Sequence, residues 1–346
     1  MSFKYPVKRT ADWHKQGSVP VVRKLKSYFR HAKSKIGGRV NDPKLVRQSG
    51  PHHPLLEHDI PAICVVRNAN NYIRSFLRYY RSLGVTRFII IDDRSVDGTT
   101  AALSNQPDVD LFSSEFEYKD TDRGKDWRDA FFDIYGRNRW YLSLDADEFL
   151  VFPGSESRSI RDFIGDLERA GMSRAHCPMI DIYPAGALSS GVFVDDGSKW
   201  PFEVSSNFDG DGYTVKHERY GSALRGGPRQ RLFGRDMRLS KFPLLWVDDA
   251  THYRLGSIHG PAPSMRNFTP ITGVLLHYRF SSDSIDEFRK IVEVGGHADG
   301  GAHYGAILAS PHFSEDFSLA YPGSLRFTGS EDLVERGFML DLRRTA

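Results

Sequence analysis

The stretch "WYLSLDADEFLVFPG" (140–154) joins an apolar run with strand character to a cluster of three acids, Asp145, Asp147 and Glu148. Closely spaced carboxylates repel one another unless a positive charge lies among them, and a divalent cation often supplies it. At the end of a strand the backbone can turn, so that both aspartates approach one site. The same pattern also occurs at solvated strand ends, where acids cap a following helix. The stretch therefore predicts either a metal site or an ordinary strand end.

Upstream of this stretch, buried strands alternate with amphipathic helices. Strands are predicted at 62–66, 87–92, 109–112 and 140–145. A helix between the first two should have Asn70 or Asn71 as its N-cap and Gly84 after its last turn. Its apolar residues recur at helical spacing: Ile73, Phe76, Leu77 and Tyr80. A second helix, 124–136, should present Trp127, Phe131 and Ile134 on one face. This alternation favours a parallel α/β sheet flanked by helices.

Downstream, the pattern becomes less regular. A helix is predicted at 159–171 and a strand at 175–183. From 184 to about 270 the chain is rich in Gly, Pro, Asp and Ser, which indicates loops and short strands of the kind that often determine specificity. A strand at 273–280 and a helix at 284–293 follow.

The composition is that of a soluble globular protein. The 346 residues are 40% hydrophobic and 26% charged. No run approaches the ~18 apolar residues of a membrane span, and the N-terminus lacks the apolar core of a secretory signal. Cys64 and Cys177 both lie in apolar, strand-like runs, which favours core residues in a reducing compartment. We therefore expect a cytoplasmic protein.

The positive charge is concentrated at the N-terminus. Residues 1–50 hold 13 Lys and Arg against two Asp, a balance of +11, and the rest of the chain carries −8. The segment 21–39, "VVRKLKSYFRHAKSKIGGR", mixes apolar and basic residues. It is either a solvated extension or an amphipathic segment that contacts an anionic membrane surface or an acidic partner. Nucleic acid is not an expected partner, because no nucleic-acid motif follows.

The conspicuous polar residues come directly after the predicted strands. Arg67 and Asn68 follow the first strand, and Asp92 and Asp93 follow the second. Ligands of parallel sheets bind at the carboxyl ends of the strands. An aspartate there can accept a hydrogen bond from the imide N–H of uracil or from ribose, and an arginine can bind phosphate or base. Turn and cap formation is the structural alternative for the acids, and a surface ion pair is that for the arginine.

Six segments, in this order, resemble the family 2 glycosyltransferases, in particular the bacterial branch described as glycosyltransferase-2-like. They are "VVRNANNYIRSFLRYYRSLGV", "FIIIDDRSVDGT", "WYLSLDADEFLVFP", "RGGPRQRLFG", "KFPLLW" and "GVLLHYRF". The resemblance covers about 61–291 and implies a GT-A (Rossmann-like) α/β fold, with a mostly parallel central sheet flanked by helices and a loop-rich acceptor region.

The resemblance also implies a division of the chain. Residues 1–60 would be a basic N-terminal extension, and 61–291 the glycosyltransferase domain, with a nucleotide half at about 61–154 and an acceptor half at about 155–291. Residues 292–346 would form a C-terminal extension, which either closes over the acceptor as a lid or packs beneath the sheet.

Carried over position by position, the resemblance places Arg67, Asn68 and Asp93 on the nucleotide. Asp145 would contact ribose and, with Asp147, a Mn²⁺ or Mg²⁺ ion, and His277 would be the third metal ligand. His277 is otherwise a core residue at the end of an apolar run, and His252 and His259 compete with it for the metal. Ala69 stands where related sequences have glutamate after Arg-Asn.

Two further roles need candidates. Arg225, Arg229 and Arg231 surround a Gly-Gly pair in "RGGPRQR" and form either a phosphate or acceptor clamp or a basic hairpin. A general base must take the proton of the acceptor hydroxyl in an inverting enzyme. We favour Asp181, because an acid inside an apolar strand calls for an explanation, although a structural hydrogen bond would also explain it. The alternatives are Glu218, Asp248 and Asp249.

The sequence therefore suggests a metal-dependent glycosyltransferase. The expected donor is a nucleotide-sugar such as a UDP-sugar, and the acceptor a glycan or glycolipid of the bacterial surface, met at the inner face of the membrane. The alternatives are a nucleotidyltransferase of similar fold, for which the glycine-free "RNANNY" lacks the expected Gly-rich loop, and a non-catalytic nucleotide- or carbohydrate-binding relative. A glycoside hydrolase would also use two carboxylates but needs no metal.

Overall fold

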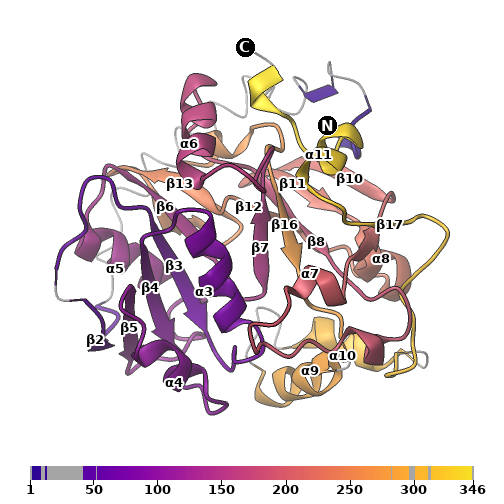
Figure 1. Cartoon of the computed structure of the whole chain (residues 1–346), viewed down its shortest axis with the longest axis horizontal. Helices are drawn as coiled ribbons and strands as arrows, with labels where there is room; N and C mark the ends of the chain where they lie inside the picture. Colours follow the sequence, from indigo (N-terminus) through magenta and orange to yellow (C-terminus); the bar gives the residue numbers. More distant parts are fainter. Residues whose placement is uncertain are drawn as a thin grey trace.

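The computed structural model describes residues 2–8, 12–13, 42–51, 53–281, 283–295, 301–310 and 313–344. Within them the chain forms a mixed α/β structure, in which a six-stranded and a four-stranded sheet lie side by side (Figure 1). The segment 21–39, predicted to contact a membrane or an acidic partner, lies outside the described residues. Among the described helices none is long and apolar enough to cross a membrane.

The six-stranded sheet has the order β13-β6-β3-β4-β5-β2. Its strands are β2 (Leu45–Ser49), β3 (Pro61–Val66), β4 (Arg87–Asp92), β5 (Val109–Ser114), β6 (Arg139–Leu144) and β13 (Leu244–Val247). The four central strands are parallel and follow the predicted runs, whereas β2 and β13 join antiparallel at the two edges. The expectation of a mostly parallel sheet is therefore met by the centre of the sheet and not by its edges.

Helices cover both faces of this sheet, because its central strands are apolar on both. α3 (Ile73–Ser82), α4 (Thr99–Ser104) and α6 (Ile160–Arg169) pack on one face, and α5 (Lys125–Tyr135) packs on the other. Alternate residues of β4 contribute to the two cores: Phe88 and Ile90 face α3, while Ile89 and Ile91 face α5.

Two details of the helix predictions are wrong. Tyr72, and neither asparagine, is the N-cap residue of α3, and no side chain caps that helix. The side chain of Asn70 instead accepts a hydrogen bond from Arg74 at 3.0 Å. Ile134 does not share the buried face of α5, since it lies in the last turn and is 57% exposed.

The four-stranded sheet has the order β12-β8-β16-β7. Its strands are β7 (Glu148–Val151), β8 (Cys177–Asp181), β12 (Ser240–Lys241) and β16 (Val274–His277). β16 runs parallel to β8 and antiparallel to β7, which places His277 opposite both Asp181 and Glu148. Because β7 directly follows β6, the turn at 145–147 connects the two sheets.

The region from 184 to 270 consists of short elements, as predicted. Its strands are β9 (Asn207–Asp209), β10 (Tyr213–Glu218), β11 (Gly221–Arg225), β14 (His252–Ser257) and β15 (Gly260–Ala262), besides β12 and β13. Its helical segments are η1 (Leu188–Gly191), α7 (Pro201–Val204), α8 (Gly227–Phe233) and η2 (Ser264–Asn267). The "RGGPRQR" segment therefore ends β11 and begins a helix, and it does not form a hairpin loop.

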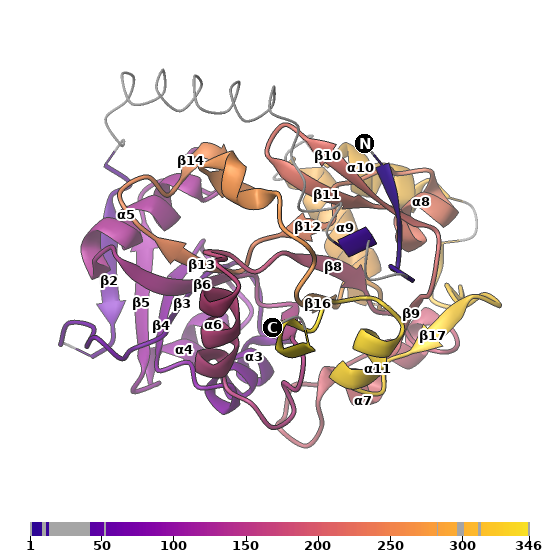
Figure 2. The ribbon, with the colours of Figure 1, turned by 90° about the horizontal axis from the view of Figure 1, so that it is seen from above.

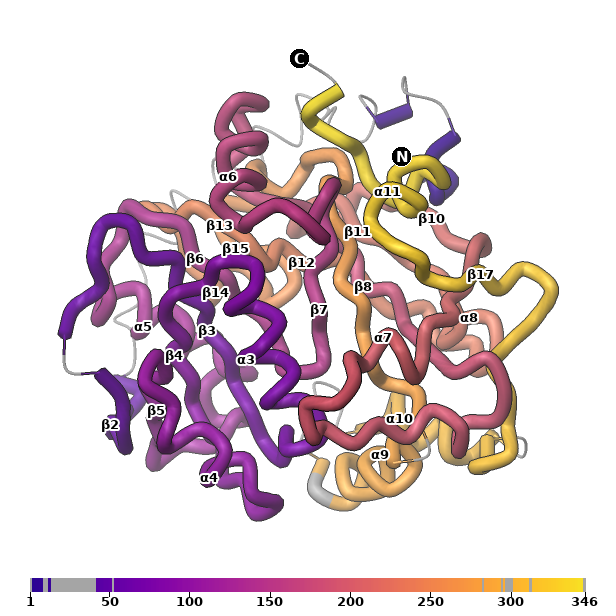
Figure 3. The backbone as a smooth tube through the Cα atoms, viewed as in Figure 1, coloured from indigo at the N-terminus to yellow at the C-terminus, as the bar shows by residue number. Residues whose placement is uncertain are grey.

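Both ends of the described chain pack beside the strands β9 and β10 (Figures 2 and 3). β1 (Ser2–Tyr5) pairs with β10, and the Tyr5 hydroxyl donates to the carbonyl of Phe338 at 2.6 Å. The C-terminal elements are α9 (Asp283–Val294), α10 (Ala302–Leu308), β17 (Ser324–Arg326), α11 (Ser330–Glu335) and η3 (Leu342–Arg344). α9 packs on α10 through Phe288 and Tyr304, whereas Phe338 belongs to the main core.

Cys64 on β3 and Cys177 on β8 are both buried free thiols. Each is fully enclosed by the main core cluster, so the sequence-based reading of small core residues is confirmed.

Candidate active site

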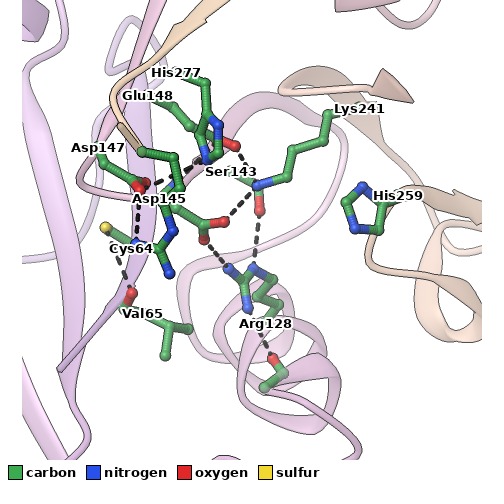
Figure 4. Close-up of polar contacts among 12 residues, drawn as sticks. Cys64, Val65, Arg128, Ser143, Asp145, Asp147, Glu148, Lys241, His259 and His277 are labelled. Atoms are coloured by element: carbon green, nitrogen blue, oxygen red, sulfur yellow. Dashed lines mark hydrogen bonds and ion pairs between the residues drawn. The ribbon is translucent and has the colours of Figure 1, made fainter. Parts of the chain in front are cut away.

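The Asp-Ala-Asp sequence forms a tight turn at the junction of the two sheets. The Glu148 amide donates to the carbonyl of Asp145 at 3.2 Å, and the Glu148 carboxylate accepts from the Asp145 amide at 3.1 Å. The Tyr278 amide donates to the carbonyl of Asp147 at 3.0 Å and so attaches the end of β16 to the turn. The turn therefore brings three strand ends, those of β6, β7 and β16, to one place (Figure 4).

Asp145 faces two cations and is not free. Lys241 of β12 forms an ion pair with one carboxylate oxygen, and Arg128 of α5 donates to the other at 3.2 Å. Burial alone would raise the pKa of Asp145, but the charges of Lys241 and Arg128 outweigh it and lower the pKa below its ordinary value. The carboxylate is thus ionised while its side chain stays 42% exposed.

Lys241 also reaches Glu148, whose carboxylate oxygen lies 2.6 Å from the ammonium nitrogen. Burial raises the pKa of Glu148, with the charge of Lys241 acting in the opposite direction. Burial would lower the pKa of Lys241, but Asp145 and Glu148 raise it above its ordinary value. The ammonium of Lys241 therefore lies between Asp145 and Glu148, two of the three acids of the 140–154 stretch.

Asp147 points to the other side of the turn. Its carboxylate oxygen lies 3.6 Å from Nε2 of His277 and accepts from Arg279 at 3.1 Å. Arg279 is also paired with Glu287 of α9 at 2.8 Å. Of the predicted metal ligands, the structure thus brings Asp147 and His277 together, while Asp145 faces Lys241.

His277 is held from behind by Asp181. Nδ1 of His277 lies 2.7 Å from the Asp181 carboxylate, and since a carboxylate only accepts, the proton is on Nδ1. Nε2, the other ring nitrogen, points towards Asp147. Arg229 donates to both oxygens of Asp181 at 2.7 and 2.8 Å. Burial raises the pKa of Asp181, but Arg229 and His277 outweigh it and lower the pKa below its ordinary value.

The three arginines of "RGGPRQR" do not form one clamp. Arg225 is paired with Glu218 at 2.6 Å, and Arg231 donates to both oxygens of Asp209 at 2.9 Å. Arg229 alone faces the site, and it is buried against Asp181. Their side chains therefore lie in three separate ion pairs.

The end of β4 shows a different arrangement. Asp93 is only 4% exposed, yet its Oδ1 atom accepts no hydrogen bond from the part of the chain that the structure describes. Burial raises the pKa of Asp93 above its ordinary value, with Arg67, 3.7 Å away, opposing this effect. A buried acceptor without a donor is costly, which makes Asp93 a natural place for a ligand N–H or O–H group.

The neighbours of Asp93 shape the loop that carries it. Asp92 accepts from the amide of Ser95 at 2.9 Å and from the hydroxyl of Thr100. The Asn68 side-chain oxygen accepts from the backbone amide of Val96 at 2.9 Å, and the backbone amide of Asn68 donates to the Ser95 hydroxyl at 2.8 Å. Asn68 thus joins the ends of β3 and β4, and its binding to a nucleotide stays a prediction.

The competing residues have other surroundings. His259 lies beside Lys241, and burial, together with the charges of Lys241 and Arg238, lowers its pKa to about 3 (Figure 4). His252 contacts the carbonyl of Asp249 at 3.1 Å, on β14. The alternative bases Glu218 and Asp248 are paired with Arg225 and with Arg266 at 2.6 Å.

Three cations of the site were not anticipated from the sequence as site residues: Arg128, Lys241 and Arg279. Lys241 opens the quoted run "KFPLLW", where a lone charge before an apolar strand is a usable signal, and Arg279 follows "LLHY". Arg128 gave no signal, because it occupies an ordinary position of an amphipathic helix.

The spacing of Asp147 and His277 can be compared with that of ligands around the implied Mn²⁺ or Mg²⁺ ion. Ligand atoms about 2.1 Å from such an ion lie roughly 3 Å apart, so the 3.6 Å separation of Asp147 and His277 suits two adjacent ligands after a small shift. In the described ranges, no three His, Cys, Asp or Glu side chains converge as a metal-binding group. The fit therefore extends to two protein ligands, with Asp145 close by on the same turn.

No protein-family model and no curated protein matches the sequence. Among solved structures, the chain is similar to 4-diphosphocytidyl-2C-methyl-D-erythritol synthase, with a TM-score of 0.34 and 13% identity over 63% of this chain and 90% of that one. It is similar to the inositol-1-phosphate CTP transferase from T. maritima, with a TM-score of 0.31 and 10% identity over 72% of this chain and 96% of that one. It is also similar to the mannosyltransferase Ktr4p from S. cerevisiae, with a TM-score of 0.22 and 10% identity over 49% of this chain and 51% of that one. Superpositions of this extent do not define a function, which must be argued from the side chains.

Proposed function

We propose that this protein is a metal-dependent glycosyltransferase, which moves a sugar from a nucleotide-sugar to a hydroxyl of a glycan or glycolipid. The observation that carries the proposal is the buried Oδ1 of Asp93, which accepts no hydrogen bond from any described residue. It lies at the edge of the parallel strands that also carries the acids of the 145–147 turn. A neutral donor group and a charged group are thus expected side by side in the ligand, as they are in a nucleotide-sugar.

Asp93 supports a uracil nucleotide. The ring N–H of an imide can donate to its Oδ1, whereas cytosine presents a ring nitrogen acceptor at the matching place. Arg67, which is half exposed next to Asp93, can contact the base or the adjacent phosphate. UDP is therefore the expected nucleotide, and CMP the expected poor ligand.

Asp147 and His277 would hold the Mn²⁺ or Mg²⁺ ion, with donor phosphates and water as its other ligands. The ion, when bound, stabilises the charge of the departing diphosphate. Asp181 and Arg229 keep the His277 ring in place, with Nε2 directed towards Asp147.

We assign Asp181 to this positioning role in preference to that of general base. Both of its oxygens are engaged by Arg229, one of them also by His277, and the side chain is buried. A base must reach the acceptor hydroxyl with a free oxygen. The observed contacts favour the structural explanation that the sequence left open for this acid.

Thermal melting against UDP, GDP, CMP and ADP, each with and without Mn²⁺, tests the proposal. A ligand present at 100 times its Kd stabilises the native state by about 2.7 kcal/mol. We expect UDP with Mn²⁺ to raise the melting temperature by several degrees and CMP to have little effect. If no nucleotide raises it, with or without metal, the proposal is wrong.

Product analysis separates glycosyl from nucleotidyl transfer. A glycosyltransferase releases UDP from a UDP-sugar when an acceptor is supplied. A nucleotidyltransferase would instead release pyrophosphate from UTP in the presence of a sugar phosphate. Detection of pyrophosphate alone would replace the proposed reaction with the alternative one.

A further inference from the structure

The acids of the site are already matched by cations. Four carboxylates face one another around the turn: Asp145, Asp147, Glu148 and Asp181. Four permanent cations pair with them: Arg128, Lys241, Arg229 and Arg279. Glu287 of α9 also contacts Arg279, and each of the four acids around the turn thus already has a cationic partner. A divalent cation that enters alone must displace one of these cations, and a diphosphate that enters alone must displace one of the acids.

Of the two described cations that contact Asp145, Lys241 is better able to change partner than Arg128. Arg128 is also bound to Ser143 at 3.1 Å and to the carbonyl of Gly124 at 3.3 Å. Arg229 is held by both oxygens of Asp181. Within the part of the chain that the structure describes, the ammonium of Lys241 is paired with two carboxylates, and it lies at the end of a flexible four-carbon chain.

A change of partner at Lys241 should also have a large energetic effect, because the side chain is buried. Its side chain is 7% exposed, so its charge acts through little water, and its partner Asp145 is the partly exposed side of the pair. A buried cation that loses one partner is strongly destabilised unless another anion replaces it. Diphosphate oxygens are the anions that the proposed donor brings to this place.

We propose that Lys241 binds the diphosphate of the donor and that it exchanges Asp145 for phosphate when donor and metal bind together. This proposal rests on the proposed function. Asp145 is released towards the metal in the same exchange, so the metal and the diphosphate assist one another. Each alone binds weakly, because the metal alone leaves Lys241 with Glu148 as its one remaining partner, and the diphosphate alone leaves Asp145 with Arg128 as its one remaining partner, among the described residues.

Binding measurements on Lys241→Met test the exchange. Free Mn²⁺ is followed by electron paramagnetic resonance in the absence of nucleotide, and UDP by calorimetry at saturating Mn²⁺. Removal of the ammonium leaves Asp145 with Arg128 as its remaining cationic partner, so we expect Mn²⁺ alone to bind roughly 10-fold tighter. UDP loses a charged partner and should bind roughly 10-fold weaker. Lys216→Met, which removes an exposed lysine of β10, is the matched control and should change neither affinity.

Opposite changes in the two affinities are specific to the exchange. If Lys241 only supports the fold, both affinities fall together in Lys241→Met, and the proposal is overturned. Lys241→Arg retains the charge and should keep Mn²⁺ binding close to that of the wild type, which guards against misfolding of the methionine variant. A wild-type protein that binds neither Mn²⁺ nor UDP would overturn the proposed function itself. If the wild type binds both, and Lys241→Met has the same two affinities as the wild type, the exchange alone is overturned.

Discussion

The end of β4 and the turn after β6 both carry acids, but the acids of the two regions differ in their hydrogen-bond and ion-pair partners. At β4, Asp92 makes the structural hydrogen bonds, and Asp93 keeps a buried oxygen for which the described part of the chain offers no donor. At the turn, Asp145 and Asp147 are each paired with cations. One region is thus ready for a neutral donor group, whereas the other is closed until a charged ligand replaces an existing partner.

This difference indicates a division of labour within one ligand site. An unfilled acceptor gains a hydrogen bond without breaking another, so the β4 end should select the base. A fully paired cluster admits charge only by exchange, so the turn should respond to the metal and diphosphate together. Substitutions at the two regions should therefore affect different measurements.

The largest effect is expected for Asp147→Asn. It removes a carboxylate that we assign to the metal, so transfer should fall by about 10²–10³-fold or more. Asp133→Asn, on the exposed side of α5, is the matched control and should leave transfer unchanged. Initial rates with saturating donor and metal give the comparison, and near-normal turnover in folded Asp147→Asn would remove Asp147 from the metal site.

A smaller effect is expected for Asp181→Asn. A group that orients a metal-bound histidine usually contributes 10- to 100-fold, so Mn²⁺ affinity should fall by roughly this factor. Excess Mn²⁺ should then restore much of kcat. The melting temperature should also fall, because Arg229 loses its charged partner, and rates are best compared at low temperature. A kcat that stays low at every metal concentration would return Asp181 to the role of general base.

The smallest effect, and the most selective one, is expected at the end of β4. Asp93→Asn should weaken UDP binding by about 10-fold and leave CMP binding nearly unchanged, since only UDP donates to the free oxygen. Asp92→Asn is the neighbouring control and should lower the melting temperature through the loop it holds. Calorimetric affinities for both nucleotides decide the matter, and an unaltered UDP to CMP ratio in Asp93→Asn would contradict base recognition.

Local patterns in the sequence were sufficient to predict the central strands and the acids that follow them, which form the candidate site. β3, β4, β5 and β6 follow the predicted apolar runs, because strands buried on both faces leave continuous apolar segments. The strand-end rule also singled out Asp93 and the 145–147 turn. These features depend on residues that are close together in the chain.

The ion pairs of the site could not be read in the same way. Lys241 meets Asp145 across 96 residues, and Arg229 meets Asp181 across 48. Such pairs arise only when two sheets come together, and neither residue carries a local signal of its partner. For the same reason the three arginines of "RGGPRQR", neighbours in sequence, separate into three ion pairs.

The pairing of β1 and β2 affects how the basic N-terminal segment can be studied. β1 covers the edge of β10, and β2 covers the edge of β5. Deletion of residues 1–50 would expose both edges, and open strand edges promote association between molecules. Loss or gain of membrane binding in such a truncation would then report aggregation as much as charge. Replacing the lysines and arginines of 21–39 while keeping both strands avoids this confusion.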